Sequence, residues 1–143
     1  MPTLSPYLNF HGNAEDAFNF YKSVFGGEFM GGIMRFGDMP DSENLSEEDK
    51  NKVMHVGLPL GDSWLMASDL PESMGKKFTA GNSVQVMISP DSREEADRLF
   101  KALSESGKVE MPMADQFWGA YYGEFADKFG VNWMIHYNNN PQK

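Results

Sequence analysis

The stretches NAEDAFNFYKSVFGG (13–27) and SREEADRLFKALSESG (92–107) decide the fold, because they predict the same amphipathic helix at two places in the chain. Each begins at a favourable N-cap residue, Asn13 or Ser92, and each ends at glycine. Apolar side chains recur at i, i+3, i+4 and i+7 in both, at Ala17, Phe20, Tyr21 and Val24 and at Ala96, Leu99, Phe100 and Leu103. A shift of 79 residues superposes the two stripes, which indicates an internal repeat.

The segments around each helix read as one strand before it and three strands after it. In the first half these are Leu4–Phe10, Glu28–Phe36, Val53–Leu60 and Ser63–Asp69. In the second half they are Ser83–Ser89, Lys108–Met113, Trp118–Ala126 and Val131–Tyr137. The closing strands also match each other, because GDSWLM (61–66) aligns with GVNWMI (130–135) at a shift of 69.

The sequence therefore predicts an α+β fold made of two tandem βαβββ modules. We expect one domain over residues 1–143, with module one at 4–70, a linker at 71–82 and module two at 83–137. The polar stretch GDMPDSENLSEEDKNK (37–52) is predicted to be a solvated loop with one helical turn at Ser46–Lys50.

Composition narrows the possible classes of protein. The 143 residues are 41% hydrophobic and include no cysteine, which predicts a core without disulfides and favours a cytoplasmic protein. No apolar run approaches the length of a membrane span, and the first residues do not resemble a signal peptide. A net charge of −9 argues against nucleic acid and anionic membranes as partners.

Three stretches carry a family resemblance. They are PYLNFHGNAEDAFNFYKSVFGG (6–27), HVGLPLGDSWLMASD (55–69) and FWGAYYGEFADKFGVNWMI (117–135). Together they resemble the PhnB-like family of the vicinal-oxygen-chelate superfamily, which includes glyoxalase I, bleomycin-resistance proteins and extradiol dioxygenases. The resemblance implies a curled mixed sheet of the glyoxalase/bleomycin-resistance fold, a cup-shaped cavity and a homodimer. In the metal-using members it also implies four ligands from the first and last strands of both modules.

The four ligand positions that the resemblance implies do not carry good metal ligands. The first-strand position falls near Pro6, with Ser5 and Tyr7 as alternative registers, and its repeat falls near Gln85, or Ser83. The last-strand positions fall on Leu65 and Met134. Proline and aliphatic side chains do not bind metals, and an amide is a weak ligand. We therefore expect no metal and no other cofactor.

Two residues are candidates for catalysis. His55 lies in a predicted strand and is the best candidate for a general base, because histidine titrates near neutral pH. Asp69 ends the next strand at the expected mouth of the cup. Each also has a structural interpretation, as a hydrogen-bonded strand histidine and as a turn-forming aspartate. His11 and His136 are predicted to be surface residues.

Alternation along the strands predicts which side chains line a ligand pocket. Leu8 and Phe10, and Val84, Val86 and Ile88, are expected to face the helices. The predicted lining of the cup is Tyr7, Asn9, Met66, Gln85, Met87, Trp118, Tyr122 and Trp133. An aromatic, thioether and amide wall is typical of small-molecule pockets, but the same side chains could instead fill a sheet or dimer interface.

The leading hypothesis is a metal-free protein that binds a small, partly apolar or aromatic molecule. A second is a metal-dependent lyase, isomerase or dioxygenase with a nonstandard centre, built from His55 with Asp69 or Gln85. A third is a non-catalytic interaction protein whose cup is filled by its own side chains. In each case we expect a homodimer.

Overall fold

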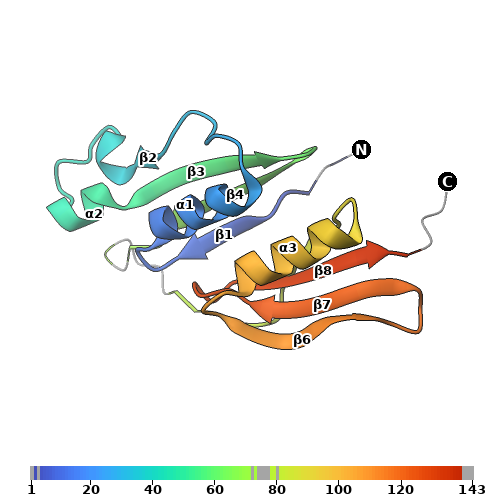
Figure 1. Cartoon of the computed structure of the whole chain (residues 1–143). Helices are drawn as coiled ribbons and strands as arrows, with labels where there is room; N and C mark the ends of the chain where they lie inside the picture. The colour runs from blue at the N-terminus through green and yellow to red at the C-terminus, as the bar shows by residue number, and fades with distance from the viewer. Residues whose placement is uncertain (1, 3, 72, 74–77, 80, 140–143) are drawn as a thin grey trace. The chain divides into compact units, whose positions relative to one another are not determined.

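The computed structural model describes residues 2, 4–71, 73, 78–79 and 81–139. The chain divides into two compact units, residues 1–79 and 80–143, which we call module one and module two. In each module one long helix lies against one face of a four-stranded sheet (Figure 1). The predicted linker at 71–82 lies partly outside the described residues.

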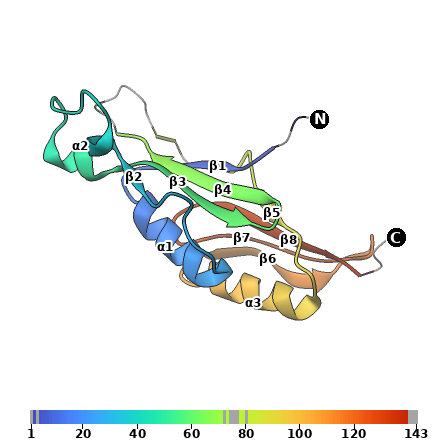
Figure 2. The ribbon, with the colours of Figure 1, turned by 90° about the horizontal axis from the view of Figure 1, so that it is seen from above.

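Module one follows the predicted order of elements. These are β1 (Tyr7–Phe10), α1 (Ala14–Phe25), β2 (Met34–Arg35), η1 (Phe36–Asp38), α2 (Glu47–Asn51), β3 (Val53–Leu60) and β4 (Ser63–Asp69). The strand order across the sheet is β1-β4-β3-β2, and β1 is parallel to β4. From above, α1 runs along one face of this sheet, while η1 and α2 lie at one end of it (Figure 2).

Module two repeats this arrangement with β5 (Val86–Ile88), α3 (Arg93–Ser104), β6 (Lys108–Asp115), β7 (Ala120–Ala126) and β8 (Asn132–Asn138). Its strand order is β5-β8-β7-β6, again with the first and last strands parallel. The prediction of an α+β fold with two tandem βαβββ modules is thus confirmed. None of the helices in the described part of the chain is long and apolar enough to cross a bilayer.

Two predictions about the strands are wrong. The predicted strand Glu28–Phe36 shrinks to two residues, because Gly31 and Gly32 adopt positive φ angles of 74° and 72° that end a strand conformation. Val84 was expected to face a helix, but β5 begins only at Val86 and the Val84 side chain is 74% exposed.

Each module has its core between the helix and the sheet. In module one, Phe18 and Tyr21 of α1 are fully buried, and the rings of Phe10 and Phe18 meet edge to face at 6.3 Å. In module two, Phe100 of α3 meets Phe125 of β7 at 5.0 Å. Burial of each large apolar side chain contributes roughly 1.5–3 kcal/mol to folding. We call the opposite side of each sheet its open face.

The two closing tryptophans lie on opposite faces of their sheets. In β4 the buried residues are Leu65, Ala67 and Asp69, so Trp64 is on the open face. In β8 Trp133 is itself buried, with only 1% of its surface exposed, and faces the helix. The sequence match at a shift of 69 is therefore not a match of position in the sheet. Unequal turns cause this, because residues 61–62 join β3 to β4 whereas residues 127–131 join β7 to β8.

Candidate functional site

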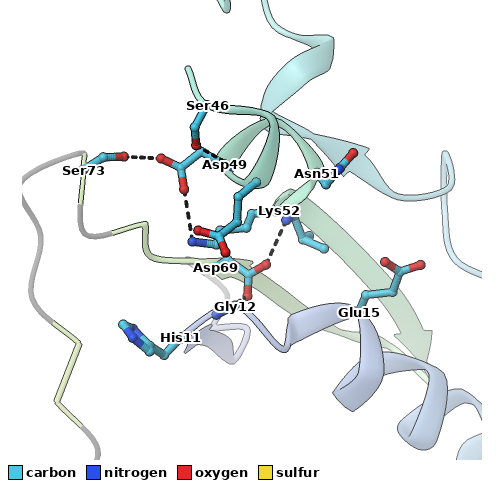
Figure 3. Close-up of a pocket in the computed structure, with 11 residues that line it drawn as sticks. His11, Gly12, Glu15, Ser46, Asp49, Asn51, Lys52, Asp69 and Ser73 are labelled. Atoms are coloured by element: carbon cyan, nitrogen blue, oxygen red, sulfur yellow. Dashed lines mark hydrogen bonds and ion pairs between the residues drawn. The ribbon is translucent and has the colours of Figure 1, made fainter. Parts of the chain in front are cut away.

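A hollow in module one lies where α2 meets the start of α1 and the end of β4. It encloses about 700 Å³ and is lined mainly by polar side chains, with Asp49 and Lys52 meeting close to Asp69 (Figure 3). His11, predicted to be a surface residue, is exposed and lies at the rim. Sequence patterns do not predict this hollow, because its lining comes from three separate segments of module one.

The Glu15, Asp49, Lys52 and Asp69 side chains of this hollow are hydrogen-bonded or ion-paired within module one. Asp49 accepts hydrogen bonds from Ser73 and, at 3.0 Å, from the Lys52 ammonium group. The Ser73 bond, more than the Lys52 bond, lowers the pKa of Asp49, and the Asp49 carboxylate raises the pKa of Lys52. Asp49 is buried, so the segment 37–52 is not entirely a solvated loop as predicted. This hollow is better explained as a structural junction than as a binding site.

Asp69, the predicted catalytic carboxylate, is 2% exposed and points to the helix side of the sheet. Its Oδ1 atom accepts hydrogen bonds from the backbone N–H groups of Gly12 and Ala14, both at 3.0 Å. Its Oδ2 atom accepts one from Val53 N–H at 2.8 Å. These three bonds favour the structural interpretation of Asp69. The structure does not bring His55 and Asp69 together, because the two side chains lie on opposite faces of the sheet.

The open face of module one gathers a group of hydrogen-bonded side chains around Tyr7. The Tyr7 hydroxyl lies 2.5 Å from Ser68 Oγ and 3.4 Å from His55 Nδ1. Tyr7 and Asn9 are both exposed, and with Ser68 and Met54 they line a second hollow of about 350 Å³. His55 is thus on the open face, beside a hydroxyl group. A catalytic role for it stays a prediction.

Gly57 allows larger side chains to gather on the same open face. It pairs with Met66 across β3 and β4. A Cβ atom at Gly57 would lie 3.5 Å from Met66 and from Trp64, and 3.8 Å from the His55 ring. Met66, a predicted lining residue, therefore sits beside an indole and an imidazole, and this is the most aromatic part of the open face of module one.

The open face of module two holds a carboxylate network. The Tyr122 hydroxyl donates a hydrogen bond of 2.5 Å to Glu124 Oε2, and the Gln85 amide donates one of 3.4 Å to Glu124 Oε1. Burial and, secondly, the Glu124 carboxylate raise the pKa of Tyr122 to about 12. Tyr122 is therefore a neutral hydrogen-bond donor at physiological pH.

Aromatic and thioether groups surround this network. Trp118 is 51% exposed, and its ring meets Tyr122 at 5.8 Å in an edge-on arrangement. Met134 Sδ lies 3.7 Å from the Tyr122 hydroxyl. His136, predicted to be a surface residue, is half-buried with its ring 6.1 Å from that of Tyr122. Met87 pairs with Met134 and is also exposed.

Trp133, a predicted lining residue, does not lie on the open face of module two. It lies in the core of module two, and its indole N–H donates a hydrogen bond of 2.8 Å to Asp127. Trp133 faces the helix side of its sheet, whereas Trp64 of β4 lies on the open face of module one.

Comparisons with known proteins show the family to which the chain belongs. The sequence profile of the family described as 3-demethylubiquinone-9 3-methyltransferase matches residues 2–136. The chain belongs to this family. It is 36% identical over 140 residues to protein YjdN of Escherichia coli, with 92% of each sequence covered. It is 37% identical to protein PA1353 from Pseudomonas aeruginosa, with a TM-score of 0.84 and coverage of 96% of this chain and 98% of that one.

Two further solved structures share the fold of the chain. The PhnB protein from Bacillus cereus is 26% identical, with a TM-score of 0.76 and coverage of 95% of this chain and 99% of that one. A glyoxalase/bleomycin resistance/dioxygenase family enzyme from Burkholderia phytofirmans shares the fold at 18% identity, with a TM-score of 0.66 and coverage of 92% and 96%. The chain is thus a PhnB-like protein of the glyoxalase/bleomycin-resistance fold.

The open faces of this PhnB-like protein do not fit the metal centre that the superfamily implies. The paired open-face positions are Tyr7 with Met66 and Asn9 with Ser68 in β1 and β4, and Met87 with Met134 in β5 and β8. Leu65, the other last-strand position, is buried on the helix side. Hydroxyls, amides and thioethers are poor ligands for the divalent metals that histidine and carboxylates hold. Among the described residues, no three His, Cys, Asp or Glu side chains form a group that could hold a metal ion.

Sequence reasoning missed Ser68 and Glu124. Both could have been found by alternation, because Ser68 is two residues after Met66 and Glu124 two after Tyr122 on the same strands. The Asp49–Ser73 contact had no such signal, because it joins residues 24 positions apart in the sequence.

Proposed function

We propose that this PhnB-like protein binds a small, partly apolar or aromatic molecule on the open faces of its sheets, without metal ligation at the paired strand positions. The observation that carries the proposal is the mixture of groups on those faces. Hydrogen-bonded polar side chains (Tyr7 with Ser68, and Tyr122 with Glu124) lie among partly exposed aromatic and thioether groups. Such a mixture gives a ligand both apolar contact and directional hydrogen bonds.

Methyl transfer, which the family description names, is not part of this proposal. An adenosyl cofactor usually sits at a glycine-rich turn between a strand and a helix. Here α1 is entered through His11-Gly12-Asn13 and α3 through Asp91-Ser92, and neither turn has that pattern. The backbone N–H groups of Gly12 and Ala14 at the entry to α1 are already bonded to Asp69.

The three tryptophans make a direct test possible, because they lie in three different environments. Trp64 is on the open face of module one, Trp118 is exposed in module two, and Trp133 is buried in the core. In a ¹⁵N–¹H spectrum each indole N–H gives one signal, which Trp64→Phe and Trp118→Phe would assign. On titration with naphthalene-sized alcohols, the signal of Trp64 or Trp118 should move and saturate while that of Trp133 stays in place.

A spectrum in which none of these signals moves would contradict the proposal. So would equal movement of all three, since a change at Trp133 reports a disturbed core rather than binding on an open face.

We also propose that the protein is a homodimer. A single chain exposes several large apolar side chains, among them Leu4 at 95% and Phe117 at 97%, and exposed apolar groups favour association. Native mass spectrometry should show a species at twice the 16.1 kDa mass of one chain. A spectrum that contains only the single chain at micromolar concentration would contradict it.

A further inference from the structure

A carboxylate that forms no ion pair with any described residue lies on the open face of module two. Glu124 is half-buried on β7, an inner strand of its sheet. Its hydrogen bonds come from two neutral groups, the Tyr122 hydroxyl and the Gln85 amide. In the part of the chain that the structure describes, no lysine, arginine or histidine forms an ion pair with it. A partly desolvated charge of this kind is costly unless a partner compensates it.

The two neutral donors fix this carboxylate without using all of its capacity. A carboxylate has about four lone-pair sites, and two of them are occupied here. Tyr122 keeps its proton, because burial and the carboxylate raise its pKa to about 12. Tyr122 therefore stays a hydrogen-bond donor to Glu124, and the Glu124 oxygens can accept one or two more hydrogen bonds.

The groups beside the carboxylate suit a cation that carries apolar surface. The negatively polarised faces of aromatic rings attract cations, tryptophan most strongly. Trp118 is half exposed and meets Tyr122 edge-on, which leaves indole surface accessible close to the network. Met87 and Met134 add polarisable thioether surface. An anionic ligand would be repelled by Glu124 and by the net charge of −9.

A bare metal ion fits this place less well. Divalent cations need several oxygen or nitrogen donors at once, whereas Glu124 is the one carboxylate of this network. An ammonium group needs only one carboxylate and gains from the rings.

We propose that the open face of module two, at Glu124, Tyr122 and Trp118, recognises a small organic cation with an aromatic or other apolar body. This inference rests on the proposed function and names the ligand class for one of its two faces. Glu124 accepts a hydrogen bond from the charged nitrogen, and Trp118 contacts the apolar body of the ligand.

Three probes with the same ring separate charge from apolar contact: 2-naphthylmethylamine, 2-naphthalenemethanol and 2-naphthoate. Binding is followed at pH 7.5 by calorimetry and by the Trp118 indole signal. We expect the amine to bind about tenfold more tightly than the alcohol and the naphthoate to bind most weakly. Raising the salt concentration should weaken binding of the amine but not of the alcohol.

Two variants and one control complete the test. Glu124→Gln keeps an acceptor for Tyr122 and should lower affinity for the amine about tenfold while leaving the alcohol unchanged. Glu94→Gln removes the same charge from an exposed position on α3 and should change neither affinity. Trp118→Leu retains the carboxylate and should weaken the amine and the alcohol together.

The possible failures are distinguishable. Equal affinity for the three probes, or an amine affinity unchanged in Glu124→Gln, overturns the assignment of a cation and leaves small-molecule binding intact. If no probe moves the signal of Trp64 or Trp118, the proposed function fails as well.

Discussion

The two modules hold the N-terminal end of their helices in different ways. In module two the cap is local: Ser92 Oγ accepts from Glu95 N–H at 3.0 Å, and the Glu95 carboxylate accepts from Asp91 N–H at 2.8 Å. In module one Asn13 occupies the N-cap position but its side chain makes no cap hydrogen bond. Asp69, which lies at the end of β4, accepts the hydrogen bonds at the helix entry instead.

This difference decides how far the loss of one side chain propagates. A local cap satisfies donors of its own helix, so its removal costs about 1 kcal/mol. Asp69 bonds the entry of α1 and the first residue of β3 as well, and so connects three elements of module one. We therefore expect Asp69 to matter to the whole module and Ser92 mainly to α3.

The largest expected effect is that of Asp69→Ala. The substitution leaves the N–H groups of Gly12, Ala14 and Val53 without their acceptor, and unsatisfied buried donors cost roughly 1–3 kcal/mol each. We expect the free energy of unfolding of module one to fall by roughly 3 kcal/mol or more, measured by urea denaturation. Asp69→Asn should also destabilise, because an amide offers one acceptor oxygen in place of two.

Ser92→Ala tests the other side of the comparison. It removes the acceptor for Glu95 N–H but leaves the rest of α3 intact, so we expect a loss of about 1 kcal/mol in the same assay. If Ser92→Ala destabilises the protein as much as Asp69→Ala does, the distinction between a local and a long-range cap is wrong.

The same comparison shows which features a sequence can predict. The S-x-x-E box of α3 and the apolar stripes of both helices are local patterns, so the sequence alone predicts them. The cap of α1 was not readable, because Asp69 is 55 residues from Ala14 and only the parallel pairing of β1 with β4 brings them together. A strand-end aspartate has the same local signature whether it caps a helix or faces a pocket.

Whether a residue lies on the open face depends on its position in the alternation along its strand. Alternation predicted that Tyr7 and Tyr122 face the cup, and both lie on the open faces of their sheets. Glu124 lies two residues after Tyr122 on β7 and therefore on the same face. The Gly-x-x-Trp match failed for Trp133, because five residues join β7 to β8 and two join β3 to β4. Turn length changes which face a residue occupies, and a motif match does not reveal it.

The open face of module two carries the Glu124 carboxylate, and the titration of Tyr122 depends on that neighbour. The pKa of Tyr122 is raised to about 12, so the folded state resists phenolate formation that the unfolded chain undergoes near pH 10. The stability that this gives is complete below pH 10 and is lost as the pH rises from about 10 to about 12. The absorbance of phenolate in wild type minus Tyr122→Phe should show this late titration.

Glu124→Gln separates the two causes of the raised pKa of Tyr122. Burial is the larger cause of the shift and remains, so the pKa of Tyr122 should fall only part of the way to its ordinary value. No change at all would mean that the carboxylate does not act on Tyr122, and the charge of the open face of module two would then need another explanation.

The smallest expected effect concerns an ion pair that joins two segments of module one. Arg35 donates to both oxygens of Glu15, at 2.9 and 3.0 Å, and these hydrogen bonds lower the pKa of Glu15. A lowered carboxylate pKa adds stability above the unfolded value near 4.3, and this is lost as the pH falls through the folded value. Because the pair is partly exposed, Glu15→Gln should cost only about 0.5 kcal/mol at pH 7.

That cost should vanish in acid, where wild type and Glu15→Gln converge as the pH falls from about 5 to about 3. The matched variant in module two is Asp115→Asn, whose carboxylate bonds Arg93 and has its pKa lowered in the same way. If each variant converges with the wild type at low pH, the surface ion pairs of the two modules behave alike. A difference at pH 7 that persists at pH 3 would instead show that the effect of Glu15→Gln does not come from the charge of Glu15, because protonation of the wild type removes that charge.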